Sequence, residues 1–187
     1  HNKVIEYDEV PQKYEWMNVT GTRLNRLNLF IAEGLYTFDD FNITENPDGT
    51  KNYKLKEGLP VSTKGSTKPG DIKLKDLNGD GVIDDFDMVK DAANPTAPEI
   101  VYGFGLNLDY KGFYASVFFQ GTGNVSTVLG QSNGPGFHPF AWGDRTSGTR
   151  IQALDRWTEE NPRQDVLYPR LSSSSNFNFV YYIFKAV

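Results

Sequence analysis

Hydrophobic and polar residues alternate most regularly between residues 100 and 120. One set of alternate positions holds Ile100, Tyr102, Phe104, Leu106, Leu108 and Tyr110, and the other holds Val101, Gly103, Gly105, Asn107 and Asp109. Side chains two residues apart share a face of a β-strand. Alternation over this many residues therefore predicts a strand with one continuous apolar face.

A turn at Lys111-Gly112 would bring the following residues back alongside this strand. On the apolar face it pairs Tyr110 with Phe113, Leu108 with Ala115, Leu106 with Val117 and Phe104 with Phe119. On the other face it pairs Asp109 with Tyr114, Asn107 with Ser116, Gly105 with Phe118 and Gly103 with Gln120. A slip of one residue would mix the two faces. The sequence therefore predicts an antiparallel hairpin over residues 99–121, with a two-residue turn or a three-residue turn with a bulge at Gly112.

The alternation fits two environments for the apolar face. Each strand has about 10 residues, the length that a tilted strand needs to cross a bilayer, and Tyr102, Tyr110 and Phe113 would suit the two membrane interfaces. A strand of a soluble β-sandwich also has one apolar face, turned toward a protein core. The pattern alone leaves both open.

The remaining segments give weaker signals. The sequence predicts one or two short strands over residues 28–38 with a break at Gly34, a loop over residues 39–72, and a strand in "GDIKLK". Short helices are predicted for "FDMVKDA" and for "TRIQALDRWTEENP", the second anchored by Trp157, and "NFNFVYYIFKAV" resembles a strand that is cut off.

The stretch "DLNGDGVIDDFD", residues 76–87, has the spacing of a calcium-binding loop. The expected oxygen ligands are Asp76, Asn78, Asp80, the carbonyl of Val82, Asp84 and Asp87, and Gly81 stands where such loops turn sharply. The last ligand is Asp rather than the usual Glu, and a strand rather than a helix precedes the motif. We therefore expect a structural Ca²⁺ site and no Ca²⁺ sensor. The alternative is a solvated turn whose Asp and Asn side chains bond their own backbone.

Composition excludes several classes of function. The formal net charge of −5 gives no general attraction to nucleic acid or to anionic membrane surfaces. The chain has no cysteine, which excludes disulfides, thiolate zinc sites and a cysteine nucleophile. No apolar run approaches the roughly 20 residues of a membrane helix. The chain begins with His and shows no signal-peptide pattern, so we expect a fragment or a processed piece.

Few residues suggest a ligand or a catalytic role. Phe137, His138, Phe140 and Trp142 in a Gly- and Pro-rich segment are candidates for a surface that stacks on a sugar, or for simple local packing. A single His without Cys is a poor zinc site. The adjacent carboxylates Asp39-Asp40 and Glu159-Glu160 are expected to be solvated charges, so no enzyme activity is predicted.

Taken together and in order, these motifs resemble a known family. "KPGDIKLKDLNGDGVIDDFD", "PEIVYGFGLNLDYKGFYASVFFQGTGN", "RWTEENP" and "YPRL" are similar to segments of the SusC/RagA-like TonB-dependent outer-membrane transporters. The N-terminal "NKVIEYDEV" and "GTRLNRLNLFIAEGLY" are similar to segments that precede them there.

The resemblance implies a late part of a 22-stranded barrel in the outer membrane of a Gram-negative bacterium, without the plug, the TonB box and the last strands. Such a protein imports oligosaccharides or peptides, is driven by TonB, and works with a SusD-like surface lipoprotein. Residues 1–98 and 122–176 would then be extracellular, residues 99–121 a transmembrane hairpin in contact with lipid, and residues 177–187 the start of a further strand.

The expected fold class is thus all-β, a partial antiparallel transmembrane β-barrel with long extracellular loops. The alternative is a soluble β-sandwich, in the role of a binding module with a structural calcium loop; a glycan-active enzyme domain is a third. Accessibility separates the first two, because Tyr102, Phe104, Leu106 and Leu108 face lipid in a barrel and a packed core in a sandwich.

Overall fold

The described part of the chain is built from short strands. The computed structural model describes residues 2–63, 65, 67–126 and 151–171. Within them ten strands form five two-stranded sheets, and the only helices are short 3₁₀ turns. The predicted all-β class is confirmed, and none of the described sheets closes into a barrel. None of the helices in this part of the chain combines the length and the apolar character needed to cross a membrane.

The elements follow one another in this order: η1 (Glu15–Met17), β1 (Leu27–Leu29), β2 (Ala32–Leu35), η2 (Phe38–Asp40), β3 (Phe41–Glu45), β4 (Lys51–Leu55), β5 (Val61–Ser62), β6 (Ile72–Leu74), β7 (Val82–Ile83), η3 (Asp85–Asp87), β8 (Val89–Ala93), β9 (Ile100–Tyr110), β10 (Phe113–Gly123) and η4 (Ile151–Leu154). The pairs β1–β8, β2–β6, β3–β4 and β9–β10 are antiparallel, and β5–β7 is parallel.

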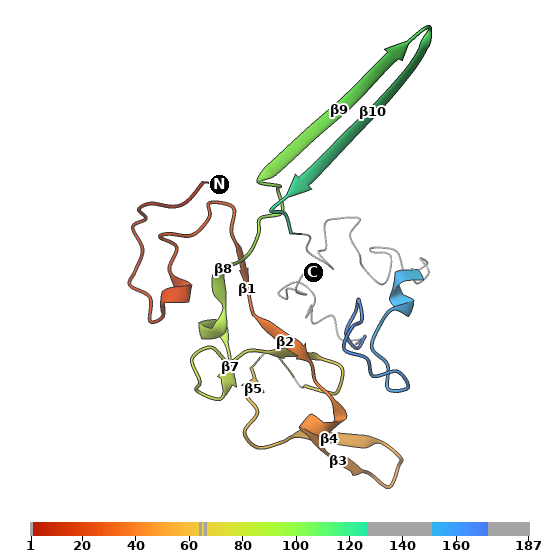
Figure 1. Cartoon of the computed structure of the whole chain (residues 1–187). Coiled ribbons are helices and arrows are strands. Elements are labelled where there is room, and N and C mark those ends of the chain that lie inside the picture. Colours follow the sequence, from red (N-terminus) through yellow and green to blue (C-terminus); the bar gives the residue numbers. More distant parts are fainter. Residues whose placement is uncertain (1, 64, 66, 127–150, 172–187) are drawn as a thin grey trace, which may run out of the picture.

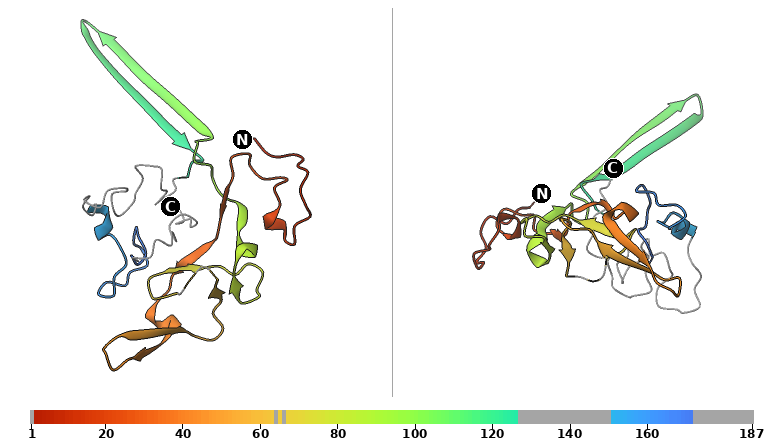
Figure 2. Two further views of the ribbon diagram at one scale, coloured as in Figure 1. Left: turned by 180° about the vertical axis from the view of Figure 1, so that it is seen from behind. Right: turned by 90° about the horizontal axis from the view of Figure 1, so that it is seen from below.

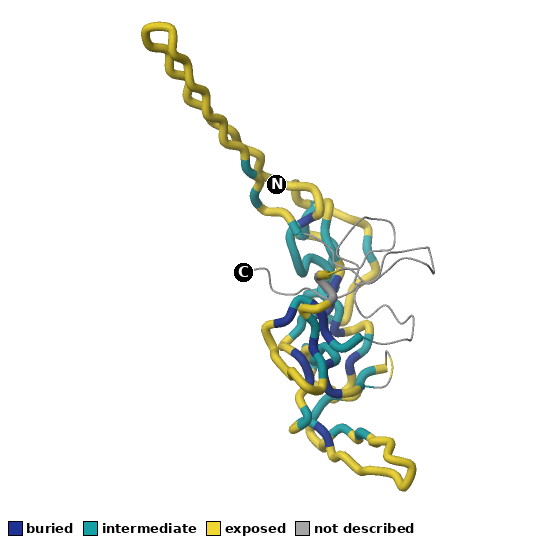
Figure 3. Tube along the Cα trace, turned by 90° about the vertical axis from the view of Figure 1, so that its right-hand side faces the viewer, coloured by how far each residue is buried: buried dark blue, intermediate teal, exposed yellow. Residues whose placement is uncertain are grey.

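The long hairpin β9–β10 stands apart from the other elements that the structure describes. It projects from a central region formed by β1, β2 and β5 to β8, and both further views show the same separation (Figures 1 and 2). The β3–β4 pair, labelled in Figure 1, forms a second, shorter arm at the end of the described structure opposite the long hairpin (Figures 1 and 3). Buried residues gather between the two arms, so the described residues form one small core with two projecting ribbons.

Most buried apolar side chains of the described residues belong to two small groups, and one further residue packs against both. Phe30, Leu74 and Ile83 form the first group, with Met88 packed against it. Leu35, Trp157 and Val166 form the second, with Phe38 packed against it. Ile72 on β6 contacts both groups, so this strand connects them.

The segment 155–171 docks on β2 and β6 through packing and polar contacts. Trp157 is only 3% exposed and lies against Gly70, where an added Cβ would come within 2.3 Å of the ring. Gln164 accepts a hydrogen bond from the backbone N–H of Leu35 at 2.9 Å and donates one to its carbonyl at 3.2 Å. Arg170 pairs with Asp71 at 2.9 Å. Burial raises the pKa of the Asp71 carboxyl above its ordinary value, an effect that the Arg170 guanidinium opposes.

Several secondary-structure predictions were wrong. Residues 86–92 contribute to η3 and the strand β8 instead of a helix, because Val89–Ala93 pair with β1. The segment 39–72 contains β3, β4 and β5 instead of a plain loop. The break in the segment 28–38 falls between β1 and β2, and Gly34 lies inside β2. Trp157 lies beyond η4 and anchors the docked segment rather than a helix.

Candidate functional site

The long hairpin has the predicted register. Phe113 faces Tyr110, Ala115 faces Leu108 and Val117 faces Leu106, and pairing continues without interruption to Gly123 opposite Ile100. The turn residues Lys111 and Gly112 have φ angles of 49° and 83°. Two consecutive positive φ angles define a type I′ turn, whose twist matches that of the strands. The two-residue alternative for the turn is therefore the observed one.

Both faces of the hairpin are exposed along almost its entire length. On the apolar face Phe104 is 62% exposed and Leu106 60% exposed, and the tube view shows almost no buried position on either strand (Figure 3). No described element packs on this face. The remaining large apolar members, Ile100, Tyr102, Leu108, Tyr110, Phe113, Val117 and Phe119, are exposed as well. An apolar surface of this extent is normally covered by protein or lipid.

Glycines and aromatic rings fit together across the two strands. Tyr102 lies over Gly121, where an added Cβ would meet its ring atoms at 2.3 Å. On the opposite face Phe118 lies across Gly103 and Gly105, at 3.0 and 3.3 Å from their would-be Cβ atoms. These glycines leave the space that the rings occupy. The ribbon therefore carries large side chains on both faces without separating its strands.

The length of the hairpin suits a bilayer. Eleven residues in each strand span about 36 Å at about 3.3 Å per residue. A tilt of about 40° reduces the height to about 28 Å, close to the apolar band of outer-membrane barrels, about 25 Å tall.

The acidic loop (residues 76–87) is stabilised by hydrogen bonds from its own backbone N–H groups to its Asp and Asn side chains. The Asp76 carboxylate accepts hydrogen bonds from the N–H groups of Gly79 at 2.6 Å and Gly81 at 2.8 Å. Asn78 accepts one from the N–H of Asp80, and Asp80 accepts one from the N–H of Val82, both at 2.9 Å. Short Asp and Asn side chains that bond the backbone a few residues ahead stabilise tight turns.

Asp87 closes the loop from inside. It is fully buried, and its two carboxylate oxygens accept the backbone N–H groups of Leu77 at 2.8 Å and Asp84 at 3.0 Å. Asp84 in turn caps η3 by accepting the N–H of Phe86 at 2.8 Å. The last predicted ligand therefore ties both halves of the loop together.

The predicted metal ligands lie in one loop, but their side chains do not gather around a common point. In the ranges that the structure describes, no three His, Cys, Asp or Glu side chains come together in a way that would hold a metal ion. The carboxylates point at backbone N–H groups, which is the geometry of the self-bonded turn. Each carboxylate oxygen that accepts one hydrogen bond retains a further lone pair with which it can bind an ion.

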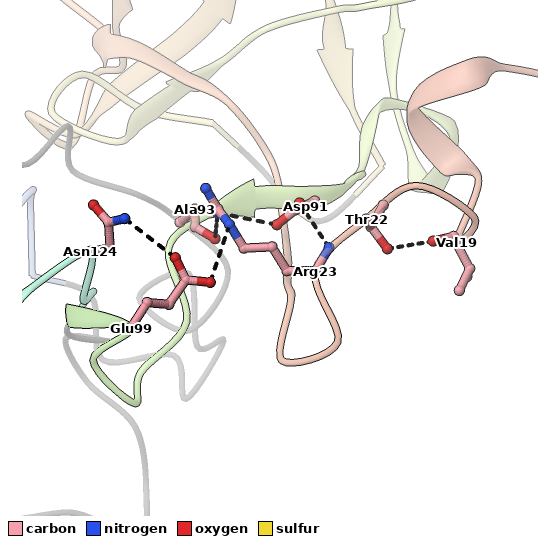
Figure 4. A network of polar contacts seen from close by, with 7 residues as sticks. All are labelled: Val19, Thr22, Arg23, Asp91, Ala93, Glu99 and Asn124. Atoms are coloured by element: carbon pink, nitrogen blue, oxygen red, sulfur yellow. Dashed lines mark hydrogen bonds and ion pairs between the residues drawn. The ribbon is translucent and has the colours of Figure 1, made fainter. Parts of the chain in front are cut away.

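A polar network joins the root of the long hairpin to the central region (Figure 4). Arg23 donates to Asp91 at 3.3 Å and to the carbonyl of Ala93 at 3.1 Å, and its Nε lies 3.8 Å from Glu99. Asn124 donates to Glu99 at 3.4 Å. Glu99 and Asn124 flank the two strands of the hairpin. Local sequence patterns do not reveal this network, because it joins residues about 70 positions apart.

The other predicted site residues contribute no site in the described regions. Phe137, His138, Phe140 and Trp142 lie outside the described residues, as does the strand expected over residues 177–187. Glu159 contacts Lys51 at 3.4 Å and Tyr53 at 3.3 Å, and Asp40 accepts from the backbone of Thr37 and contacts Lys73. These two carboxylates therefore make polar contacts with the shorter arm and with its base.

Comparison with known proteins gives one informative similarity. The chain is 37% identical over 107 residues to the TonB-dependent receptor P26 of Formosa agariphila, a match that covers 57% of this chain and 10% of that receptor. It is 27% identical over 140 residues to an acid beta-fructofuranosidase of Solanum lycopersicum, with 64% of this chain and 21% of that enzyme covered. The chain thus spans a small part of each relative. No family model matches the sequence.

Proposed function

We propose that this chain is a section of a TonB-dependent importer in the outer membrane of a Gram-negative bacterium. The observation that carries the proposal is the exposed apolar face of the long hairpin. The apolar side chains of β9 on this face, from Ile100 to Tyr110, are exposed, and the residues paired with them on β10 are apolar as well. The 37% identity to a TonB-dependent receptor supports it from an independent direction.

A soluble sandwich fits the hairpin less well. In such a fold the side chains of Phe104 and Leu106 would pack against a second sheet. In the described part of the chain they meet only their neighbours within the hairpin, such as the Phe104–Phe119 ring stack at 5.0 Å. The backbone edges of β9 and β10 also lack strand partners there. Neighbouring strands of a larger barrel would satisfy these edges, as membranes require.

The same proposal predicts which end of the hairpin faces the periplasm. Outer-membrane barrels have short periplasmic turns and long extracellular loops. The two-residue turn at Lys111-Gly112 would therefore lie in the periplasm, and the central region and the shorter arm outside the cell. In that position they would meet a SusD-like surface lipoprotein and an oligosaccharide or peptide substrate. TonB would act through a part of the protein outside this chain, and no catalytic step is proposed.

The acidic loop would then have a structural role outside the cell, where calcium is abundant. We propose that Ca²⁺ binds Asp76, Asn78 and Asp80 together with the carbonyl of Val82, Asp84 and Asp87, after small rearrangements of the self-bonded turn. Ordering a loop by an ion offsets the conformational entropy of fixing it.

Calcium titration tests this role. Binding with a Kd of about 10⁻⁴–10⁻³ M is expected, since extracellular sites of this type are weak. Calorimetry should show the binding, and proteolysis within residues 76–87 should slow down. Asp76→Asn should abolish both effects, whereas Asp39→Asn, outside the loop, should leave them unchanged. Absence of binding in the wild-type protein would identify the loop as a self-sufficient turn.

Location and energy dependence test the proposed function itself. The complete protein that contains this chain, expressed in a Gram-negative host, should fractionate with the outer membrane. Cells should accumulate fluorescent oligosaccharides or peptides from a labelled panel, and deletion of tonB or addition of a proton uncoupler should stop this uptake. Recovery of the complete protein in the soluble fraction would contradict the proposal.

A further inference from the structure

The connection between the central region and the long hairpin is short and stiff. β8 ends at Ala93 and β9 begins at Ile100, and the residues between them include Pro95 and Pro98. Proline fixes its own φ angle, so such a connection bends at few points. The φ angles of Pro95 and Pro98 are fixed, and the chain bends at Thr96 and Ala97 between them.

Arg23 contacts both ends of this connection (Figure 4). On the side of β8, its Nη1 lies 3.3 Å from the Asp91 carboxylate and 3.1 Å from the Ala93 carbonyl. Its backbone N–H also donates to Asp91 at 3.1 Å. On the side of the hairpin, its Nε lies 3.8 Å from Glu99. One guanidinium group thus bridges the proline-containing connection from end to end.

The bridge continues to the second strand of the hairpin. Glu99 accepts from the side chain of Asn124 and donates its backbone N–H to the Asn124 carbonyl, both at 3.4 Å. The N–H of Ser126 donates to the carbonyl of Pro95 at 2.9 Å. The Glu99 side chain is 13% exposed and that of Arg23 26%, so water screens the ion pair only in part. At the end of the hairpin nearest the central region, β9 and β10 are therefore both connected through Glu99 to the same guanidinium group.

We infer that Arg23 is a clamp that fixes the direction of the long hairpin relative to the central region. Under the proposed function, on which this inference rests, it couples the extracellular region to the barrel wall, so that the two move together. A lysine cannot take its place, because a single ammonium group does not reach both carboxylates as the forked guanidinium does.

Distance measurements on the complete protein in lipid nanodiscs test the clamp. Spin labels are placed at Asn28→Cys on β1 and Tyr114→Cys on β10, both exposed positions; this chain has no native cysteine, and any cysteine elsewhere in the complete protein is first replaced by Ser. The parent should give one narrow distance distribution. Arg23→Gln should lose this narrow peak, and Arg23→Lys should lose it too. Lys51→Gln, which removes the exposed pair with Glu159, should keep it.

Misfolding of the Arg23 variants would also remove the narrow peak, and Glu99→Gln separates this cause from loss of the clamp. It removes the ion pair between Arg23 and Glu99 and leaves the contacts between Arg23 and Asp91 intact. It should also lose the narrow peak while the outer-membrane yield stays unchanged. A narrow peak retained in Arg23→Gln or in Glu99→Gln would overturn the clamp, and so would rescue by Arg23→Lys. The width of the distance distribution tests the clamp, whereas location and TonB-dependent uptake test the proposed function, so the two failures are distinguishable.

Discussion

Replacement of Leu106 by Arg in the complete protein is expected to prevent most of it from assembling in the outer membrane. Leu106 lies near the middle of β9, on the apolar face, and is 60% exposed. If this face contacts lipid, a cationic side chain there costs about 2–4 kcal/mol at the bilayer midplane. The measurement is the fraction of folded protein in outer-membrane extracts, together with its midpoint of unfolding in urea in lipid vesicles.

Asn107→Arg is the matched control, because Asn107 is the next residue along the strand and lies at nearly the same depth on the opposite face. It loses one exposed hydrogen bond from Ser116 and should assemble almost normally. Leu106→Val keeps the apolar face and should assemble as well. Equal tolerance of Arg at positions 106 and 107 would contradict a lipid-facing role for the apolar side.

Gly70→Ala is expected to detach the docked segment 155–171 from β2 and β6. The added methyl group would lie 2.3 Å from two carbon atoms of the Trp157 ring, which is buried and has little room to move. Overpacking of this kind costs about 1–3 kcal/mol. Gly70 also has a φ angle of 85°, and the left-handed conformation costs a residue with a Cβ about 1–2 kcal/mol more. The readouts are the free energy of unfolding and the rate of proteolysis within residues 155–171.

Gly58→Ala separates the two causes of instability in Gly70→Ala, namely the clash with Trp157 and the left-handed backbone conformation. Gly58 has nearly the same φ angle, 87°, but an added Cβ would meet nothing within 4 Å. It should therefore show only the smaller backbone cost and leave the docked segment protected. If the two alanine variants lose equal stability, the contact between Gly70 and Trp157 contributes nothing.

The long hairpin was predictable from the sequence because its information is local. Strict alternation and a turn at Lys111-Gly112 determine which residues face each other, and the observed register agrees at every predicted pair. The all-β class followed for the same reason. The two faces could be distinguished from the sequence, but what covers the apolar one could not, since lipid and a protein core select the same side chains.

The shorter arm was missed although the sequence contained a signal for it. The strands β3 and β4 flank Pro47, Asp48 and Gly49, a combination typical of a tight turn. Their exposed positions are mostly polar, so hydrophobic alternation is weak and the segment resembled a loop. Turn chemistry was the more reliable signal in this segment.

Long-range contacts were beyond local pattern analysis. The strand β8 was mistaken for a helix because its partner β1 lies about 60 residues earlier. Arg23 reaches Asp91 and Glu99, and Trp157 packs on Gly70, through the tertiary fold alone. For the acidic loop, the spacing identified the residues correctly as a unit. It did not show that Asp87 would be buried and bonded to two backbone N–H groups.

The most direct test of the proposed membrane hairpin is a spin-label scan of residues 104–109 in the complete protein in lipid bilayers. Each variant carries one label, and its collision rates with oxygen and with a water-soluble nickel chelate are measured. The proposal predicts alternation with a period of two residues, with oxygen dominant at Phe104, Leu106 and Leu108 and with relatively more nickel contact between them. Labels at these three positions that are shielded from both reagents would indicate a packed protein core and contradict the proposal.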